Sequence, residues 1–533
     1  MVFSEKFVYL VISMVVTGLC EAANVLVVVL MPSYSHQLPA LAITSELLRR
    51  GHHVTYIGTN SLPELDRSNS FIDLSFAYRN MGRTGSSESN INFQKKLDRW
   101  KMPEIYGRSF KLAKQQLSSG QLKTFLRELK EGKMTYDSIL IEGKYSTILV
   151  PLLRNHCGSI PIVALSSLSV DTLLENHLGS IQHLSFVPML FNGYSDTMSL
   201  WQRLDNWWST LWLYSSLQKV TFSEAQDVLA EHGIHEVELN GIYRQISLFI
   251  IASNPLYNYP RILAPNVINV GPLHLQMDNH SLPIRIQNWL DDAEMGVIYI
   301  SFGSNMKSTS LPDGALRTLV SVVNEFSPNY RVLWKWESTD QLPGQLNDTI
   351  MTQKWLPQQK VLAHPKVKLF ITQGGLQSFQ EAVHFGVPMV GVPWYGDQFL
   401  NVEKIVSSGI GVRLDSEDLT NAQRVRKSVS SVLTDPRYSE KMKRHSEISR
   451  DFSAQSMDNA VWYLEHVTKF GGADHLRPKS AGTSYFSFFC WDILAFILML
   501  ASVIICSLVY AGQFIVVFFY NKLCHQQNLK SNK

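Results

Sequence analysis

The chain has 533 residues, of which 45% are hydrophobic and 17% charged, and its formal net charge at pH 7 is +3. This length exceeds what one hydrophobic core can hold, so two or three domains are expected, and the balanced composition excludes a predominantly disordered protein. The small net charge gives no reason to expect nucleic acid or another polyanion as a partner.

The first 22 residues are predicted to be a signal peptide. Lys6 supplies the positive start, residues 7–20 form an apolar stretch too short to span a bilayer, and small residues follow near Ala22 and Ala23. The alternative, a buried first strand, fits the continuous apolar run at 24–30 better. The mature protein is therefore expected to begin near residue 23 and to lie outside the cytosol.

Alternating strands and helices are predicted next. The run at 24–30 suits a strand buried on both faces of a parallel sheet, residues 32–39 are interpreted as a loop, and helical spacing covers 40–50. A strand at 54–57 completes a βαβ unit, which indicates a doubly wound α/β sheet. Further strands of the same kind are predicted at 138–141 and 162–165.

The segment 186–214 is unusually aromatic, and its tryptophans are Trp201, Trp207, Trp208 and Trp212. At helical spacing, one face collects Leu200, Leu204, Trp207 and Leu211. Packing of this face in the core is the commonest explanation of such a pattern. An aromatic wall for an apolar substrate and a face resting on a membrane are the alternatives.

A second group of strands is predicted at 296–301, 331–336, 369–372 and 389–392, with helical segments between them. The two groups indicate two similar domains, 23–268 and 269–480, joined near 266–283. Ligands of doubly wound sheets bind beyond the carboxyl ends of the strands. The site is therefore expected in a cleft between the two domains.

The stretch 370–398 carries most of the chemical information. A strand runs into Gln373, Gly374 and Gly375, and a helix begins near Gln377. Glycines let backbone N–H groups approach an anion, and the helix N-terminus adds partial positive charge, so a diphosphate would fit. Turns of two glycines between a strand and a helix are common, so this signal alone is weak.

Polar side chains surround this turn. Ser378 and Glu381 lie on the first turn of the predicted helix, where a carboxylate can bind the two hydroxyls of a ribose or simply stabilise the helix dipole. Asp397 and Gln398 follow the next strand, and an adjacent carboxylate and amide suit the hydroxyls of a sugar.

Two further elements precede the turn. Trp355 and Gln358 lie close together, and an indole beside an amide can stack a nucleobase and contact its edge. Ser304 ends a small-residue turn after a predicted strand, where its hydroxyl can reach a phosphate. No Asp-x-Asp metal motif is present, and Cys157 is the one cysteine of the presumed folded body, which excludes a disulfide framework or a Cys-based zinc site there.

The C-terminal region contains a predicted transmembrane helix at 493–520, because no charged residue lies between Asp492 and Lys522. Residues 521–533 form a short basic tail, which the positive-inside rule places in the cytosol, although Arg477 and Lys479 precede the span. With a cleaved signal peptide, the folded body is expected on the opposite side.

The stretch 370–398 resembles the signature of the UDP-glycosyltransferases, the animal membrane-bound family with the GT-B fold, and the resemblance extends to invertebrate members. It implies two Rossmann-like domains facing a cleft, with the uracil, phosphates, ribose and donor sugar of a UDP-sugar bound in the second domain. On these positions it places the base at Trp355 and Gln358, the phosphates at Ser304, Gln373 and the turn of Gly374 and Gly375, the ribose at Glu381, and the sugar at Asp397 and Gln398. Gln377 and Ser378 are counted among the residues that bind the UDP-sugar. Many members have His in place of Gln373 and Asn in place of Gln377.

The resemblance also implies a catalytic pair. His36 occupies the family's base position after the first strand, although from its location alone a structural role is commoner. A neutral imidazole there can take the proton of an acceptor hydroxyl, and a carboxylate must orient it. The family usually supplies Asp after the strand at 138–141; this chain has Glu142 there, and Asp137, at the other end of the strand, is the weaker candidate.

The implied activity is inverting transfer of a hexosyl group from a UDP-sugar, which acts as co-substrate with no permanently bound cofactor or metal, to a hydroxyl of a small lipophilic acceptor. The segment 252–260 lacks the Arg of glucuronosyl members, which favours UDP-glucose over UDP-glucuronate. The implied location is the endoplasmic reticulum membrane, type I, with the body in the lumen; Asn279 and Asn347 begin glycosylation sequons there. Detoxification is one role such acceptors suggest. The alternatives to this activity are an inactive UDP-sugar-binding or scaffold homologue and a carrier of lipophilic ligands. Assembly into a homo-oligomer is left open.

Overall fold

A computed structural model describes residues 22–81, 97–276, 281–304, 306–327, 329–338 and 346–531. The described part divides into two compact units, a body that ends at Pro478 and a C-terminal unit that begins at Lys479. The predicted signal peptide lies outside the described residues apart from Ala22, and so does the sequon at Asn279.

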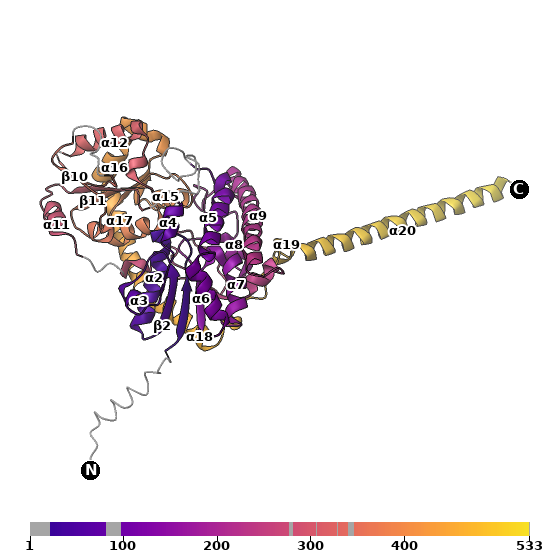
Figure 1. The fold of residues 1–533 in the computed structure, drawn as a ribbon. Coiled ribbons are helices and arrows are strands. Elements are labelled where there is room, and N and C mark those ends of the chain that lie inside the picture. Colours follow the sequence, from indigo (N-terminus) through magenta and orange to yellow (C-terminus); the bar gives the residue numbers. More distant parts are fainter. Residues whose placement is uncertain are drawn as a thin grey trace, which may run out of the picture. The chain divides into compact units, whose positions relative to one another are not determined.

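The first half of the body contains a parallel seven-stranded sheet (Figure 1) in the order β3-β2-β1-β4-β5-β6-β7. Its strands are β1 (Asn24–Val28), β2 (His53–Gly58), β3 (Phe71–Asp73), β4 (Ser138–Glu142), β5 (Ile162–Ser166), β6 (Ile246–Ile251) and β7 (Val267–Asn269). Its helices are α2 (Tyr34–Arg49), α3 (Pro63–Arg67), α4 (Phe76–Met81), α5 (Met102–Leu117), α6 (Gly120–Lys130), α7 (Ser146–Cys157), α8 (Thr172–His177), α9 (Leu200–Glu231) and α10 (Leu239–Arg244).

Strand β1 shows why the continuous apolar run was informative. Leu26 and Val28 lie in the core cluster that also contains residues of α5, α6 and α7, whereas Val25 and Val27 lie in the cluster on the opposite face, with residues of α2. Successive side chains of a strand point to opposite faces, so a strand covered on both sides needs apolar residues at every position. The predicted doubly wound sheet is confirmed.

The second half contains a parallel six-stranded sheet in the order β10-β9-β8-β11-β12-β13. Its strands are β8 (Val297–Ser301), β9 (Arg331–Lys335), β10 (Ile350–Gln353), β11 (Val367–Thr372), β12 (Met389–Gly391) and β13 (Gly411–Arg413). Its helices are α11 (Ile284–Asp291), α12 (Asp313–Phe326), α13 (Gln358–Leu362), α14 (Leu376–Phe385), α15 (Gln398–Ser407), α16 (Ala422–Thr434) and α17 (Pro436–Ser453).

The predicted loop at 32–39 was wrong, because helix α2 begins at Tyr34 and contains Pro39. Proline is tolerated near a helix start, where early N–H groups have no helical partner, but it lacks the N–H that would bond the carbonyl four residues earlier. The carbonyl of Ser35 therefore loses its helical partner. It accepts a hydrogen bond from outside the helix, described below.

The preferred interpretation of segment 186–214 was also wrong. Leu200, Leu204 and Trp207 are 67%, 53% and 47% exposed, so this face of α9 does not pack in the core. The opposite face is buried instead and carries Asn206, whose amide donates to the carbonyls of Leu184 and Val187 and accepts from the Met189 N–H. Buried backbone groups need partners, so a polar helix face is required here.

Helix α18 (Ser456–Lys469) packs on the first sheet, although the predicted second domain, 269–480, includes it. Val461 and Leu464 belong to the same core cluster as Val25 and Val27 of β1. On its polar side, Arg50 of the first half forms an ion pair with Asp458 at 2.6 Å. The chain therefore crosses back from the second half of the body to the first after α17.

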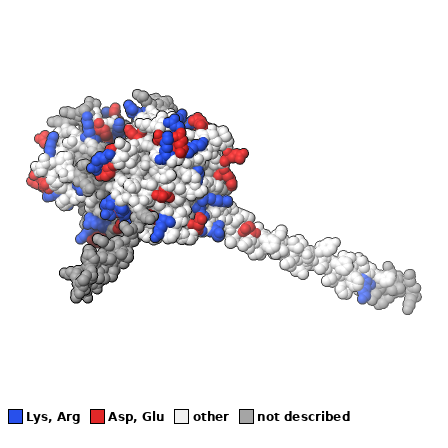
Figure 2. Space-filling model, turned by 60° about the horizontal axis from the view of Figure 1, so that its bottom comes forward, with Lys and Arg blue, Asp and Glu red and all other residues white. Residues whose placement is uncertain are grey.

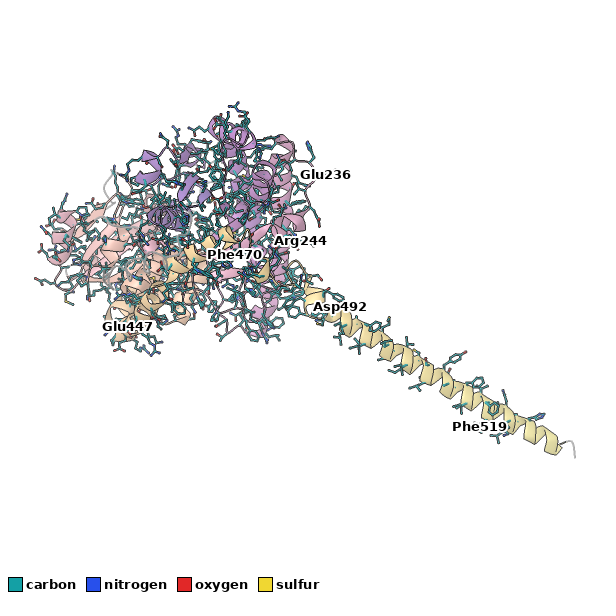
Figure 3. All side chains as sticks on the ribbon, turned by 90° about the horizontal axis from the view of Figure 1, so that it is seen from below. Glu236, Arg244, Glu447, Phe470, Asp492 and Phe519 are labelled. Carbon is teal, nitrogen blue, oxygen red and sulfur yellow. The ribbon has the colours of Figure 1, made fainter. Side chains whose placement is uncertain are left out.

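The C-terminal unit consists of α19 (Tyr485–Phe488) and α20 (Trp491–Ser531), which includes the predicted span 493–520. Among the described residues, α20 is the one helix long and apolar enough to cross a membrane, by length and composition. Figure 2 shows a nearly uncharged surface along it, and Figure 3 shows exposed side chains such as Phe519 projecting from it. These features are those of a membrane anchor.

Candidate active site

His36 lies on the first turn of α2, just beyond the carboxyl end of β1. Its Nδ1 lies 3.1 Å from Oε1 of Glu142 and 2.9 Å from Oγ of Ser167. Glu142 ends β4 and Ser167 follows β5, and parallel pairing of β1, β4 and β5 brings these strand ends to one edge. The imidazole is thus held through Nδ1, and Nε2 has no partner among the described residues.

Glu142 is itself positioned, because its Oε2 accepts a hydrogen bond of 2.9 Å from the Met31 N–H. The carboxylate side chain is 6% exposed and the His36 side chain 18%. Asp137, the weaker candidate, begins at the opposite end of the strand, where it accepts from the Asn24 N–H at 2.7 Å. Ser167 was missed, because a serine after a strand has no distinctive pattern in the sequence.

Asp397 lies in the second half of the body, as the N-cap of α15. Burial raises the pKa of its carboxyl, while a hydrogen bond from Asn401 and the charge of His36 lower it. The Asn401 amide donates to Asp397 at 2.8 Å and to the Gly374 carbonyl at 3.0 Å. The carboxylate corner and the glycine turn are therefore joined by one side chain.

Gln398 lies beside Asp397 at the start of α15. Its Oε1 accepts from the N–H groups of Trp394 and Tyr395 at 2.9 and 3.2 Å, so the amide oxygen shapes the preceding turn. Its Nε2 lies 3.7 Å from the sulfur of Met306. Only this amide nitrogen is left to contact a sugar hydroxyl.

The glycine turn requires its glycines. Gly374 has φ +79°, and a Cβ there would lie 2.4 Å from Cγ2 of Val402. Gly375 is the N-cap of α14, so backbone N–H groups of a ten-residue helix point beyond it. The Gln373 amide packs against Gly303, next to the exposed Ser304, because a Cβ on Gly303 would lie 2.3 Å from Nε2 of Gln373.

The predicted ribose-binding residues form a connected network. Nε2 of Gln358 donates to Ser378 at 2.9 Å and to Glu381 at 2.7 Å, and Oε1 of Gln358 accepts from the Tyr299 hydroxyl at 3.1 Å. Nε2 of His274 lies 3.2 Å from Glu381. Glu381 is therefore fixed in place before any ribose hydroxyl reaches it.

Trp355 is 59% exposed, as a stacking surface for a nucleobase must be. The Tyr34 ring approaches it edge-on at 5.9 Å, and the Lys335 ammonium lies 5.3 Å from the indole centroid. Lys335 also donates to the Gly303 carbonyl at 2.7 Å and pairs with Glu337 at 3.1 Å. Lys335 ends β9 and Glu337 follows it. Neither residue was predicted from the sequence.

Gln377 lies on the first turn of α14 but points to the first half of the body. Its Nε2 donates to the carbonyls of Ser35 and Ser167, at 3.3 and 3.2 Å. The Ser35 carbonyl is the one that Pro39 leaves without a helical partner. Gln377 thus connects the glycine turn to both sides of His36, whereas it was predicted among the residues that bind the UDP-sugar.

A cavity of about 50 Å³ lies in the first half, next in the chain to Glu142 and Ser167, the two partners of His36. Gly143 and Lys144 line it and follow Glu142 directly, and Leu168 lines it and follows Ser167. Most of the remaining lining is apolar or aromatic, including Leu213 and Tyr243. This volume holds only a few water molecules, so a larger molecule would require side chains to move.

A family model described as UDP-glucoronosyl and UDP-glucosyl transferase matches residues 23–528. The chain belongs to this family. The family member UDP-glycosyltransferase UGT5 of Dactylopius coccus is 30% identical over 393 residues, 73% of this chain and 72% of that protein. The ecdysteroid UDP-glucosyltransferase of Spodoptera littoralis nuclear polyhedrosis virus is 26% identical and covers 92% of this chain and 96% of its own length.

Among solved structures, the glycosyltransferase of kitacinnamycin matches with a TM-score of 0.55 at 17% identity, and covers 84% of this chain and 99% of its own. That likeness confirms the GT-B fold, with two parallel Rossmann-type sheets. Membership in the UDP-glycosyltransferase family establishes the general activity, which is transfer of a sugar from a UDP-sugar to an acceptor. The expected co-substrate class and the enzyme class are both confirmed at this level.

Proposed function

We propose that this UDP-glycosyltransferase transfers glucose to a hydroxyl of a lipophilic acceptor, with His36 as general base and Glu142 as its orienting carboxylate. The observation that carries the proposal is the imidazole held at Nδ1 by Glu142 and Ser167, with Gln377 of the other half bonded to the carbonyls of Ser35 and Ser167 beside it. A base fixed in this way presents Nε2 to an acceptor hydroxyl.

The reaction is a single displacement. The acceptor oxygen forms a bond to carbon 1 of the glucose, the bond from carbon 1 to the diphosphate breaks, and the hydroxyl proton passes to Nε2 of His36. Attack opposite the leaving group inverts the anomeric configuration, so an α-linked donor gives a β-glycoside. Backbone N–H groups at the start of α14 stabilise the charge that develops on the diphosphate.

Two observations support glucose over glucuronate. Asp397 is a carboxylate, and the described residues place no Lys or Arg side chain in contact with it or with Gln398. A sugar carboxylate would therefore meet negative charge without a compensating cation. The relative from the Spodoptera littoralis virus is named a UDP-glucosyltransferase. Competition among UDP-glucose, UDP-galactose and UDP-glucuronate tests this choice, and preferential use of UDP-glucuronate would refute it.

The decisive experiment compares His36→Ala with His52→Ala in microsomes that contain the full chain. His52 forms a similar pair with Glu465, Nε2 to Oε1 3.1 Å, away from the cleft. We expect His36→Ala to abolish transfer of glucose to 2-naphthol while UDP binding persists, and His52→Ala to retain transfer. Unchanged turnover of His36→Ala would refute its role, and UDP binding without transfer by the unaltered enzyme would favour the inactive homologue.

We also propose an endoplasmic reticulum location, type I, with the body in the lumen. The apolar helix α20 and the exposed Asn347 at the start of a sequon support this topology. Endoglycosidase treatment of the protein made in insect cells should increase its gel mobility, and Asn347→Gln should remove part or all of that shift. A body digested by protease in sealed microsomes would contradict the proposal.

A further inference from the structure

The cavity beside the catalytic pair contains two oppositely charged side chains that do not pair with each other. Lys144 and Asp171 both line it, and among the described residues no carboxylate lies within 4.0 Å of the Lys144 ammonium. The ammonium instead lies 4.5 Å from the Tyr106 ring centroid and 3.8 Å from the sulfur of Met31. Charges in a mainly apolar cavity are costly unless a partner compensates them.

The Asp171 side chain is held by the start of helix α8. It is the N-cap of α8 and accepts a hydrogen bond of 3.1 Å from the Leu174 N–H. Burial raises the pKa of its carboxyl to about 6 and lowers that of the Lys144 ammonium to about 8, and each charge acts favourably on the other. The two groups therefore face the cavity with a separation larger than an ion pair.

The cavity wall begins with the residues next in the chain to those that hold His36, which are Glu142 and Ser167. Tyr106 also lines the cavity. Burial, and then the negative charges of Asp171, Asp397 and Glu142, raise the pKa of its hydroxyl. A molecule with one hydroxyl at His36 would reach Lys144 and Asp171 with its remaining part only after the side chains around the cavity, now about 50 Å³, move apart.

We propose that Lys144 and Asp171 form an acceptor subsite for a second hydroxyl, so that preferred acceptors are lipophilic diols or diphenols. This rests on the proposed transfer function. A hydroxyl oxygen can accept from the ammonium while its proton is donated to the carboxylate, so one neutral group satisfies both charges. An anionic acceptor would be repelled by Asp171 and Glu142, and a cationic one by Lys144.

The test compares 2-naphthol with a set of dihydroxynaphthalene isomers, with UDP-glucose as donor and UDP release as the readout. In the unaltered enzyme, kcat/KM for the best diol should exceed that for 2-naphthol by about tenfold or more, since buried polar groups disfavour an analogue that leaves them unpaired. Lys144→Met and Asp171→Asn should each reduce this ratio to about twofold or less, by raising KM for the diol while KM for UDP-glucose stays constant.

Lys404→Met is the matched control, because Lys404 is a half-buried lysine 4.7 Å from the Tyr259 ring centroid and does not line the cavity. It should leave the ratio unchanged. No transfer to any acceptor would refute the proposed function itself. Transfer to 2-naphthol as efficient as to every diol, or an unchanged ratio in both variants with normal UDP binding, would refute the subsite alone.

Discussion

Replacing Gln377 by methionine tests whether this residue aligns the catalytic base or binds the donor. The methionine side chain has the same length but cannot donate to the carbonyls of Ser35 and Ser167. A neutral hydrogen bond contributes about 0.5–1.5 kcal/mol net, and these two are long and share one nitrogen, so their joint contribution is about 1–2 kcal/mol. That energy corresponds to a change of about five- to thirtyfold in the equilibrium constant between the aligned and the unaligned positions of His36.

The expected result is therefore a fall of about five- to thirtyfold in kcat for Gln377→Met, with the Kd for UDP unchanged. Stopped assays of UDP release at saturating UDP-glucose, together with titration calorimetry of UDP, measure the two quantities. Gln380→Met is the control, since Gln380 also bridges the two halves, donating to the Ala252 carbonyl at 3.1 Å, but does not bond to the first turn of α2, which carries His36. A raised Kd for UDP with unchanged kcat would show that Gln377 binds phosphate and would refute the alignment role.

Three further predictions concern the donor and acceptor sites. Trp355→Ala should raise the Kd for UDP by about 5- to 150-fold, because stacking on an aromatic ring is worth about 1–3 kcal/mol. Titration calorimetry measures this Kd, and replacement of the exposed Trp201 by alanine should leave it unchanged. Gly374→Ala should abolish UDP binding and lower the melting temperature, because φ is +79° and a neighbouring valine leaves no space for Cβ; normal binding would contradict this. The preference for diols over 2-naphthol should be greatest between about pH 6 and 8, measured as a ratio of Kd values in the presence of UDP. Asp171 loses its charge as the pH falls through its pKa of about 6, and Lys144 loses its charge as the pH rises through its pKa of about 8. A ratio that is constant from pH 5 to 9 would contradict the assigned charges.

Much of the fold could be predicted because buried parallel strands are written in the sequence as continuous apolar runs. The runs at 24–30 and 296–301 both correspond to central strands covered on two faces. Helix boundaries were less accessible: Pro39 indicated a loop, yet it lies inside α2, because an external donor satisfies the carbonyl that the proline leaves free. Nothing in the local sequence around Pro39 could reveal a donor more than 300 residues away.

The candidate site divides in a similar way. Glu142 was predicted from the resemblance, which implies a carboxylate after the strand at 138–141, and the structure places it 3.1 Å from His36. Ser167 and Lys335 were missed, since a polar residue after a strand is common and gains meaning only from its spatial neighbours. The buried face of α9 was predicted to carry leucines and tryptophans. The structure instead buries Asn206, which bonds to backbone groups of residues 184–189 that have to be satisfied in the interior.

The attachment of α18 makes the two halves of the body mechanically unequal. This helix packs on the first sheet, and the Arg477 guanidinium, beyond it, donates to the Ile246 carbonyl of that sheet. The polypeptide that leads to α20 therefore leaves from the half that contains His36. With α20 held in a membrane, we expect the half that contains His36 to stay in place. The half that contains the glycine turn is then the one expected to move when UDP leaves.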